Sequence, residues 1–197
     1  NAQVPIDVFN GSLVRPQFFN IPKARSQGFE IETGWNLTRW LELNANYSYL
    51  DAKITSVKGM PVFSDPSVPG TAAVDLVGNR MPQSSKHKIS LSGLIDIPTA
   101  SGSHFMLAGS YVYRSKAYYS VLNGPHSLAP GWDQVDARLT WVDPSQRFTA
   151  ILYVRNLFDK LGYDGAAGGS GSASQGFGRT YSFTPPRSFG AEVQFKF

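Results

Sequence analysis

Apolar and polar residues alternate along seven segments of the chain. In the last segment Phe189, Val193 and Phe195 occupy odd positions, whereas Glu192 and Gln194 occupy even ones. A period of two residues places alternate side chains on opposite faces of a β-sheet. The pattern therefore predicts an all-β protein in which each strand has one apolar and one polar face. The seven segments cover residues 28–37, 41–49, 88–97, 104–114, 134–141, 148–155 and 189–197.

The connections between these segments are alternately short and long. In one short connection Asp143 and Pro144 occupy the first two positions that a type I turn favours. Short turns at one end and long loops at the other are typical of an antiparallel transmembrane β-barrel. We therefore expect the short turns and the C-terminus on the periplasmic side and the long loops on the outside. The short connections are 38–40, 98–103 and 143–146, and the long ones are 56–84, 119–131 and 162–184.

Aromatic residues fall at both ends of the predicted strands, as the two girdles of a membrane barrel do. A soluble β-sandwich also has alternating strands. Seven strands of about 10 residues with very unequal loops nevertheless favour the membrane barrel over the sandwich. The short-turn girdle comprises Trp35, Phe105, Trp141, Phe148 and Phe197, and the long-loop girdle comprises Phe29, Tyr49, Tyr113 and Phe158.

The composition supports an apolar environment and excludes several functions. Charged residues make up 16% of the 197 residues, well below the roughly 25% of ordinary soluble domains. The chain has no Cys and no run of about 20 apolar residues, so disulfides and a transmembrane helix are not expected. The net charge of +4 is spread along the chain, which does not favour nucleic acid as a partner. The three His residues are far apart in sequence, and we expect no metal site and no cofactor.

Seven strands cannot close an antiparallel barrel, because the first and last strands then run in the same direction. The first residues lack signal-peptide features, so we expect a mature chain or a piece of one. Val4, Ile6 and Val8 alternate, but Pro5 removes a ladder donor. We therefore predict that residues 1–21 are the end of an extracellular loop and that residues 22–197 are a barrel segment. The alternative is a complete eight-stranded barrel of structural or adhesive type, with residues 2–9 as its first strand.

Several short motifs, in this order and spacing, resemble those of the TonB-dependent outer-membrane receptors over roughly residues 22–197. The match is to the C-terminal part of the β-barrel in that family. Each motif is weak alone, and the resemblance depends on their combination. The motifs are Gly28–Glu32, Asn46–Ala52, Gly78–Pro82 followed by His87 and Lys88, Pro130–Arg138, Val154–Lys160 and Pro186–Gly190, with Phe197 at the end.

The resemblance implies that these are the last seven strands of a plugged barrel of about 22 strands. Family members import a scarce nutrient such as a siderophore-like chelate, cobalamin, a sugar or a peptide. The implied location is the outer membrane of a Gram-negative bacterium, with a periplasmic C-terminus, and no enzymatic activity is implied. The implied partners are outer-membrane lipid, a plug-and-barrel N-terminal portion of the same receptor in this or a separate chain, the TonB energy-coupling protein acting through that portion, and the barrel-assembly machinery.

Three groups of residues are candidates for function, and none of them is catalytic. The first, on the polar face, is expected to face the plug or to form a salt-bridged wall: Glu30, Glu32, Arg114, Asp136, Arg138 and Arg155. The second, in long loops, is expected to bind ligand or to pack loop on loop: Tyr118, Tyr119, Trp132, Phe177, Arg179 and Tyr181. The third resembles the family's barrel-assembly signal, although it could equally anchor the periplasmic rim: Phe189, Phe195 and Phe197.

A barrel enzyme is a third class of function that the sequence leaves open. It would require a histidine and a nucleophilic hydroxyl within hydrogen-bond reach at one rim of the barrel.

Overall fold

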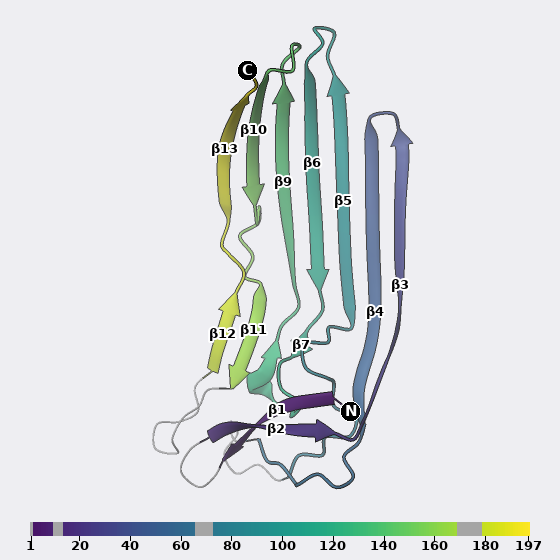
Figure 1. Ribbon diagram of the computed structural model, residues 1–197, viewed down its shortest axis with the longest axis vertical. Coiled ribbons are helices and arrows are strands. Elements are labelled where there is room, and N and C mark those ends of the chain that lie inside the picture. Colours follow the sequence, from purple (N-terminus) through teal and green to yellow (C-terminus); the bar gives the residue numbers. More distant parts are fainter. Residues whose placement is uncertain (1, 10–13, 66–72, 169–178) are drawn as a thin grey trace.

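The computed structural model describes residues 2–9, 14–65, 73–168 and 179–197. Its main element is a seven-stranded antiparallel sheet in the order β13-β10-β9-β6-β5-β4-β3 (Figure 1). All seven predicted strands are confirmed, and the first two are longer than their alternation indicated, at 16 residues each. The sheet is open, with β3 and β13 at its edges. The strands are β3 (Lys23–Thr38), β4 (Leu41–Ser56), β5 (His87–Pro98), β6 (His104–Arg114), β9 (Trp132–Val142), β10 (Phe148–Arg155) and β13 (Ser188–Phe195).

The register of the sheet gathers the apolar side chains on one face. Along one row Trp35 pairs with Leu43, Leu43 with Gly93, Gly93 with Gly109, and Gly109 with Ala137. Side chains of directly paired residues share a face, so the apolar positions of successive strands form a continuous surface. Large side chains on this face are exposed, among them Leu152 at 57% and Val193 at 65%. Such an apolar surface requires an apolar environment.

The short connections lie together at one end of the sheet, where the C-terminus is also found (Figure 1). In the turn between β9 and β10 the Asp143 carboxylate accepts hydrogen bonds from the backbone N–H of Phe148 at 2.7 Å and of Ser145 at 3.1 Å. These bonds close the turn, and the backbone of Gln146 adopts a φ of 56° there. Nearby, the rings of Trp141 and Phe148, two members of the predicted short-turn girdle, meet edge to face with centroids 5.9 Å apart.

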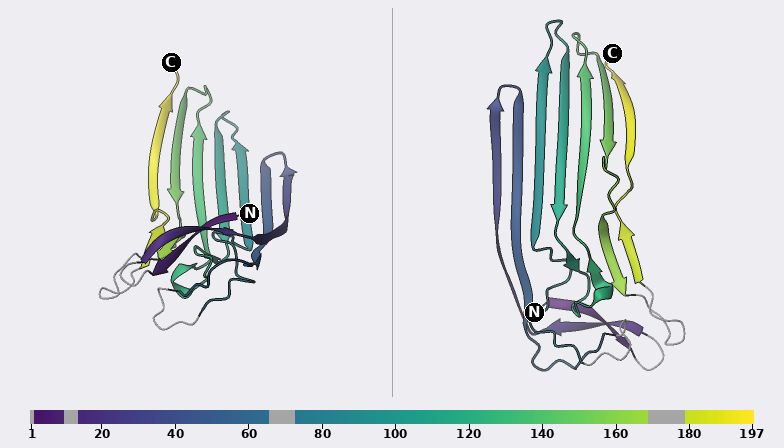
Figure 2. Two further views of the ribbon diagram at one scale, coloured as in Figure 1. Left: turned by 60° about the horizontal axis from the view of Figure 1, so that its bottom comes forward. Right: turned by 180° about the vertical axis from the view of Figure 1, so that it is seen from behind.

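At the long-loop end three small two-stranded sheets extend beyond the main sheet (Figure 1). In both views of Figure 2 the β1–β2 hairpin lies across this end. In the part of the chain that the structure describes, the one helix is a 3-10 turn of three residues, and no helix there could cross a membrane. The added elements are β1 (Ala2–Phe9) with β2 (Val14–Ile21), β7 (Ala117–Tyr118) with β8 (Leu128–Ala129), β11 (Tyr163–Gly168) with β12 (Arg179–Phe183), and the helix η1 (Pro125–Ser127).

The β1–β2 hairpin bears on the alternative in which residues 2–9 supply the first barrel strand. These residues do form a strand despite Pro5, but β1 pairs with β2 along its whole length, from Ala2 with Ile21 to Phe9 with Val14. Neither strand belongs to the seven-stranded sheet. A two-stranded ribbon tolerates proline because one side of each strand has no partner. The eighth strand of a small closed barrel is therefore not supplied by this segment.

The main buried apolar cluster lies among the loops rather than within the sheet. Phe19 of β2 and Phe63 meet edge to face with centroids 4.9 Å apart, which joins the hairpin to the loop that follows β4. Because this cluster removes apolar side chains from water, the loops pack into one body that covers the end of the sheet. Its buried members are Val4, Ile6, Ile21, Ile54, Phe63, Leu76, Val121 and Leu122.

Candidate functional site

The polar face of the sheet carries a hollow of about 620 Å³ across β4, β5, β6, β9, β10 and β13. Three of the residues predicted to face a plug, Asp136, Arg138 and Arg155, line it. The other three, Glu30, Glu32 and Arg114, line an adjoining hollow of about 270 Å³. The structure therefore brings all six onto one face, because their positions have the same parity in the register of the sheet.

These six side chains do not form the salt-bridged wall that was one expectation. Within the described residues, none of them takes part in an ion pair. Their contacts are with neutral neighbours: Gln134 donates to Oδ1 of Asp136 at 2.8 Å, and Arg138 donates from Nε to the Thr140 hydroxyl at 3.4 Å. Arg155 lies 5.8 Å from the ring centroid of Tyr153. The charged groups therefore stay available to a partner outside this segment.

A second, smaller site lies where three long loops meet the long-loop ends of β6 and β9. It is a hollow of about 160 Å³ in which Trp132, Tyr119 and Arg114 converge. Trp132 donates from Nε1 to the carbonyl of Tyr163 at 3.1 Å, and the Tyr119 hydroxyl donates to the carbonyl of Asp164 at 2.9 Å. The Arg114 guanidinium lies 6.0 Å from the Trp132 ring centroid, within cation–π range. We call this site the mouth pocket; its lining comprises Gln83, Ser85, Arg114, Ser115, Ala117, Tyr119, Ala129, Pro130, Trp132, Tyr163 and Asp164.

The electrostatics of the mouth pocket favour donor groups. Burial raises the pKa of the Tyr119 hydroxyl; the nearby Arg114 opposes this effect and Asp164 adds to it. The phenol is therefore neutral near pH 7 and serves as a hydrogen-bond donor. The phenol and the indole already donate to backbone carbonyls, so the hollow offers a ligand the Arg114 guanidinium and two aromatic rings, which suit anionic oxygens and aromatic groups.

The predicted loop residues divide between this pocket and its surroundings. Tyr119 and Trp132 line the pocket, whereas Tyr118 lies in β7 beside Leu128, and its carbonyl accepts a hydrogen bond from Gln83 N–H at 2.7 Å. Tyr181 packs on Tyr163 at 5.6 Å between centroids, in the β11–β12 hairpin. Phe177 lies outside the described residues, as does the side chain of Arg179, whose backbone pairs with Gly168.

Sequence reasoning missed Tyr163, Asp164 and Gln83 as parts of the mouth pocket. Gln83 and Tyr163 are 80 positions apart and join only when the loops fold together. Sequence reasoning also assigned Arg114 to the polar face alone, although it reaches both sites. The adjacency of aromatic and polar residues at 163–164 was a weak signal that had no periodicity to support it.

The motif Gly78–Pro82 ties two long loops together. Arg80 N–H donates to Oδ1 of Asn123 at 2.8 Å, and Asn123 donates back from Nδ2 to the Arg80 carbonyl at 3.0 Å. Asn79 donates from Nδ2 to the carbonyl of Val121 at 2.8 Å. Asn123 adopts a φ of 51°, a conformation that asparagine tolerates better than most residues. This motif therefore shapes the loop body rather than contacting the hollows directly.

The aromatic residues at the C-terminus lie on the exposed apolar side of an edge strand. Phe189 is 81% exposed, Phe195 is 56% exposed, and Phe197 is fully exposed after the end of β13. The rings of Phe195 and Phe197 meet edge to face with centroids 5.3 Å apart. An edge strand with exposed aromatic side chains is accessible to another protein or to lipid, so both the assembly and the anchoring interpretations remain predictions.

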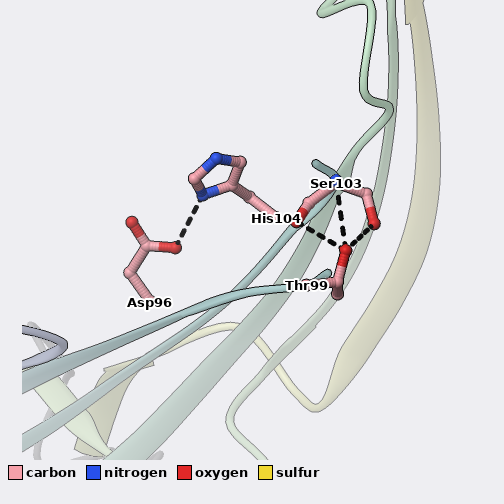
Figure 3. Close-up of polar contacts among 4 residues, drawn as sticks. All are labelled: Asp96, Thr99, Ser103 and His104. Carbon is pink, nitrogen blue, oxygen red and sulfur yellow. Dashed lines mark hydrogen bonds and ion pairs between the residues drawn. The ribbon is translucent and has the colours of Figure 1, made fainter. Parts of the chain in front are cut away.

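A cluster of hydroxyls and a histidine at the turn between β5 and β6 bears on the enzyme alternative (Figure 3). Nδ1 of His104 lies 3.3 Å from Oδ1 of Asp96. The Thr99 hydroxyl bonds to the Ser103 hydroxyl at 2.7 Å, and in Figure 3 the imidazole has a dashed contact with Asp96 alone. Within this cluster of four residues no hydroxyl is hydrogen-bonded to the imidazole; at the long-loop end the Tyr47 hydroxyl lies 2.8 Å from Nδ1 of His87. The structure likewise brings no three potential metal ligands together among the residues it describes.

Comparisons with known proteins identify related chains. The sequence model of the family described as TonB dependent receptor-like, beta-barrel, matches residues 1–157. No curated protein matches the chain. Three solved structures match 98–99% of this chain, which spans only 26–29% of their length.

These three structures share the fold at low sequence identity. The ferric yersiniabactin uptake receptor FyuA from Yersinia pestis is 16% identical with a TM-score of 0.70, over 99% of this chain and 29% of that one. The siderophore receptor PiuA from Acinetobacter baumannii is 18% identical with a TM-score of 0.66, over 99% of this chain and 28% of that one. The ferric preacinetobactin receptor BauA from Acinetobacter baumannii is 16% identical with a TM-score of 0.63, over 98% of this chain and 26% of that one.

Proposed function

Because the chain belongs to the TonB-dependent receptor-like β-barrel family, we propose that it is the C-terminal barrel segment of an outer-membrane receptor that imports a scarce nutrient. The observation that carries this proposal is the continuous apolar face across seven strands, opposite a polar face with unpaired charges. Lipid covers the first face and the interior of the receptor meets the second. The segment is non-enzymatic and works with a plug-bearing N-terminal portion of the same receptor, in this or a separate chain.

The nutrient belongs to the class of iron–siderophore chelates. Two considerations favour this class over cobalamin, sugars and peptides. Three structures of similar fold are named as receptors for siderophores or ferric siderophores, and the mouth pocket presents Arg114, Tyr119 and Trp132 together. Siderophore chelates carry acceptor oxygens and often aromatic rings, which such a set of donors and π-faces suits. Tyr118, Phe177, Arg179 and Tyr181 belong to the same binding surface in this proposal.

The plug occupies the polar side of the sheet. Glu30, Glu32, Asp136, Arg138 and Arg155 contact it, and TonB acts on the receptor through the plug-bearing portion. Support comes from the absence of ion pairs among these groups within the described residues. An unpaired charge near a protein interior is stabilised when a partner of opposite charge meets it.

The receptor lies in the outer membrane with the short turns and the C-terminus in the periplasm and the loop body outside. Residues 1–21 then belong to an extracellular loop and residues 22–197 to the barrel. The exposed Phe189, Phe195 and Phe197 on the last strand serve as the signal for the barrel-assembly machinery.

Two measurements test this proposal. The first is the intact mass of the detergent-purified particle, before and after denaturation by heat. We expect the 21.6 kDa of this sequence to occur with, or within, a larger plug-bearing polypeptide. A single 21.6 kDa species that migrates as a complete folded barrel would contradict the proposal.

The second measurement is uptake of radioactive iron by cells that express the receptor under iron limitation. We expect uptake when a ferric siderophore is supplied and loss of that uptake when the receptor is deleted. Uptake of labelled cobalamin or sugar with no response to ferric siderophores would overturn the substrate class.

A further inference from the structure

The apolar face of the sheet is not uniformly covered by side chains. A hollow of about 370 Å³ opens on this face across β3 to β6 and β9, away from the polar side. Gly93 of β5 and Gly109 of β6 form its floor, and they are directly paired across the two strands. We call it the apolar hollow; the side chains around it are those of Trp35, Leu43, Ala45, Leu91, Tyr111 and Val135.

The backbone does not require glycine at either floor position. The described glycines with positive φ are Gly59, Gly78 and Gly102, and both floor residues have ordinary strand geometry. A Cβ atom at Gly109 would come within 4 Å of a single neighbour, the carbonyl oxygen of Asp136 at 3.9 Å. Glycine weakens a strand interior, and its presence there often marks close approach of a ligand or another backbone. At Gly93 a Cβ atom would lie 3.1 Å from Cδ2 of Leu43, so this glycine makes room for the Leu43 side chain, whereas Gly109 leaves the space above it open.

The position and lining of the apolar hollow define what can fill it. Gly109 is the middle residue of β6 (His104–Arg114), so the hollow lies within the depth that the strands cross. Because β5 and β6 are interior strands, their backbone groups are hydrogen-bonded on both sides, and an added strand has no free edge to pair with. The side chains on this face around the floor are aliphatic or aromatic; the lining also includes Asn44, Ser92 and Ser110, whose positions alternate to the polar face. A flexible hydrocarbon chain suits this surface better than a polar ligand or a peptide strand.

We propose that the apolar hollow is a binding site for one acyl chain of a membrane phospholipid. This inference rests on the proposed function, because it requires the sheet to span the outer membrane. Trp35 lies a few residues before the short turn between β3 and β4, which is periplasmic in the proposed orientation. In the register Trp35 lies in one row with Leu43, Gly93 and Gly109, so the indole borders the hollow at the short-turn end of β3. The chain therefore comes from the periplasm-facing leaflet, and the hydrocarbon lies between Trp35 and Tyr111 over the paired glycines.

Photocrosslinking of the receptor in vesicles tests this site. The receptor, extracted intact from outer membranes, is reconstituted with phosphatidylethanolamine that carries a diazirine in the middle of one acyl chain, and crosslinked peptides are mapped by mass spectrometry. We expect crosslinks to concentrate on Leu91, Tyr111 and Val135. Gly109→Leu fills the hollow and is expected to reduce them to the level found on the rest of the apolar face. Ala191→Leu, which adds the same side chain to the apolar face of β13, leaves them unchanged.

Three results would overturn the proposal. Crosslinks spread evenly over the apolar face, or crosslinks that Gly109→Leu leaves unchanged, would mean that bulk lipid covers the sheet without a specific site. Preferential labelling by a diazirine-bearing lipid A would assign the chain to the other leaflet. Gly109→Ala keeps the test interpretable if the leucine variant fails to fold, because it fills less space and is expected to give a smaller loss. Heat-dependent gel migration of each variant reports membrane insertion separately, so a failure of the proposed function is distinguishable from a failure of the site.

Discussion

The backbone N–H of Asn156 donates a 2.8 Å hydrogen bond to Oδ1 of Asp136, which joins the long-loop end of β10 to β9. Asn156 is 2% exposed and adopts a φ of 52°. Its side chain donates to the carbonyls of Lys160 at 2.9 Å and Pro185 at 3.2 Å and accepts from Lys160 N–H at 2.9 Å. One residue thus fastens the ends of β9 and β10 and the segment before β13. Within the motif Val154–Lys160 the asparagine therefore has a structural role.

We predict that Asn156→Ala lowers the free energy of unfolding by about 2–3 kcal/mol, because it leaves buried backbone groups unpaired and strains a residue with positive φ. The measurement is urea unfolding of the purified receptor. Asn156→Gly removes the side-chain bonds but relieves the strain, so we expect an intermediate loss. Equal stability of all three proteins would show that this junction contributes little.

The mouth pocket predicts a specific loss of ligand affinity. Trp132→Ala removes the indole that Arg114 faces and the hydrogen bond to Tyr163, and we expect the Kd for a ferric siderophore to rise about tenfold or more. Trp132→Phe keeps a ring but loses the bond and should cause a smaller rise. Trp40→Ala, at the short turn between β3 and β4, is the matched control. Affinity is measured by the quenching of intrinsic fluorescence as the ferric siderophore binds. Equal affinities of the Trp40 and Trp132 variants would contradict the prediction.

The unpaired arginines of the polar face predict that reversing their charge loosens the plug. The double variant Arg138→Glu with Arg155→Glu should weaken the contacts between the sheet and the plug. Each ion pair that is lost is worth up to about 1 kcal/mol when the pair is partly exposed. A loosened plug should raise the ion conductance of the receptor in a planar bilayer. Arg147→Glu, in the turn before β10 and outside the hollow, makes the charge change of one such substitution and is the control for each single variant. Unchanged conductance of the double variant, with the barrel folded, would show that these groups do not hold the plug.

The turn between β9 and β10 predicts a pH dependence. Hydrogen bonds from the Ser145 hydroxyl and from backbone N–H groups, that of Phe148 first, hold the pKa of Asp143 below its ordinary value of 3.8. A carboxyl group with a lowered folded-state pKa stabilises the fold above its unfolded-state pKa, and this stabilisation is lost as pH falls through the folded-state pKa. We therefore expect the melting temperature of the receptor to decrease when the pH is lowered below about 4.

Asp143→Asn provides the control for this pH dependence. It keeps a hydrogen-bond acceptor but cannot ionise, so the variant should melt at a lower temperature than the parent at pH 7 and should lose less on acidification. Parallel melting curves for the two proteins between pH 3 and pH 7 would exclude a role for this carboxylate.

The strands and their two faces followed from the sequence alone. A period of two needs only neighbouring residues, and antiparallel register then carries the parity of Leu43, Gly93 and Gly109 from strand to strand. The short turns were equally local, since Asp143 bonds to groups within five residues. Even the placement of Glu30 and Arg138 on one face required nothing beyond this parity. The family resemblance drew on motifs of the same local kind.

The tertiary structure alone decided the contacts among the loops. Val4 lies in a buried cluster with Val121, and Trp132 bonds to Tyr163, although no periodic pattern connects these positions. Such contacts depend on how long, irregular segments close and on which apolar groups they bury together. The pairing of β1 with β2 was decided in the same way, because an alternating segment can pair with any strand that reaches it. Sequence determines the faces of a strand through local geometry, whereas the choice of partner depends on the packing of the whole chain.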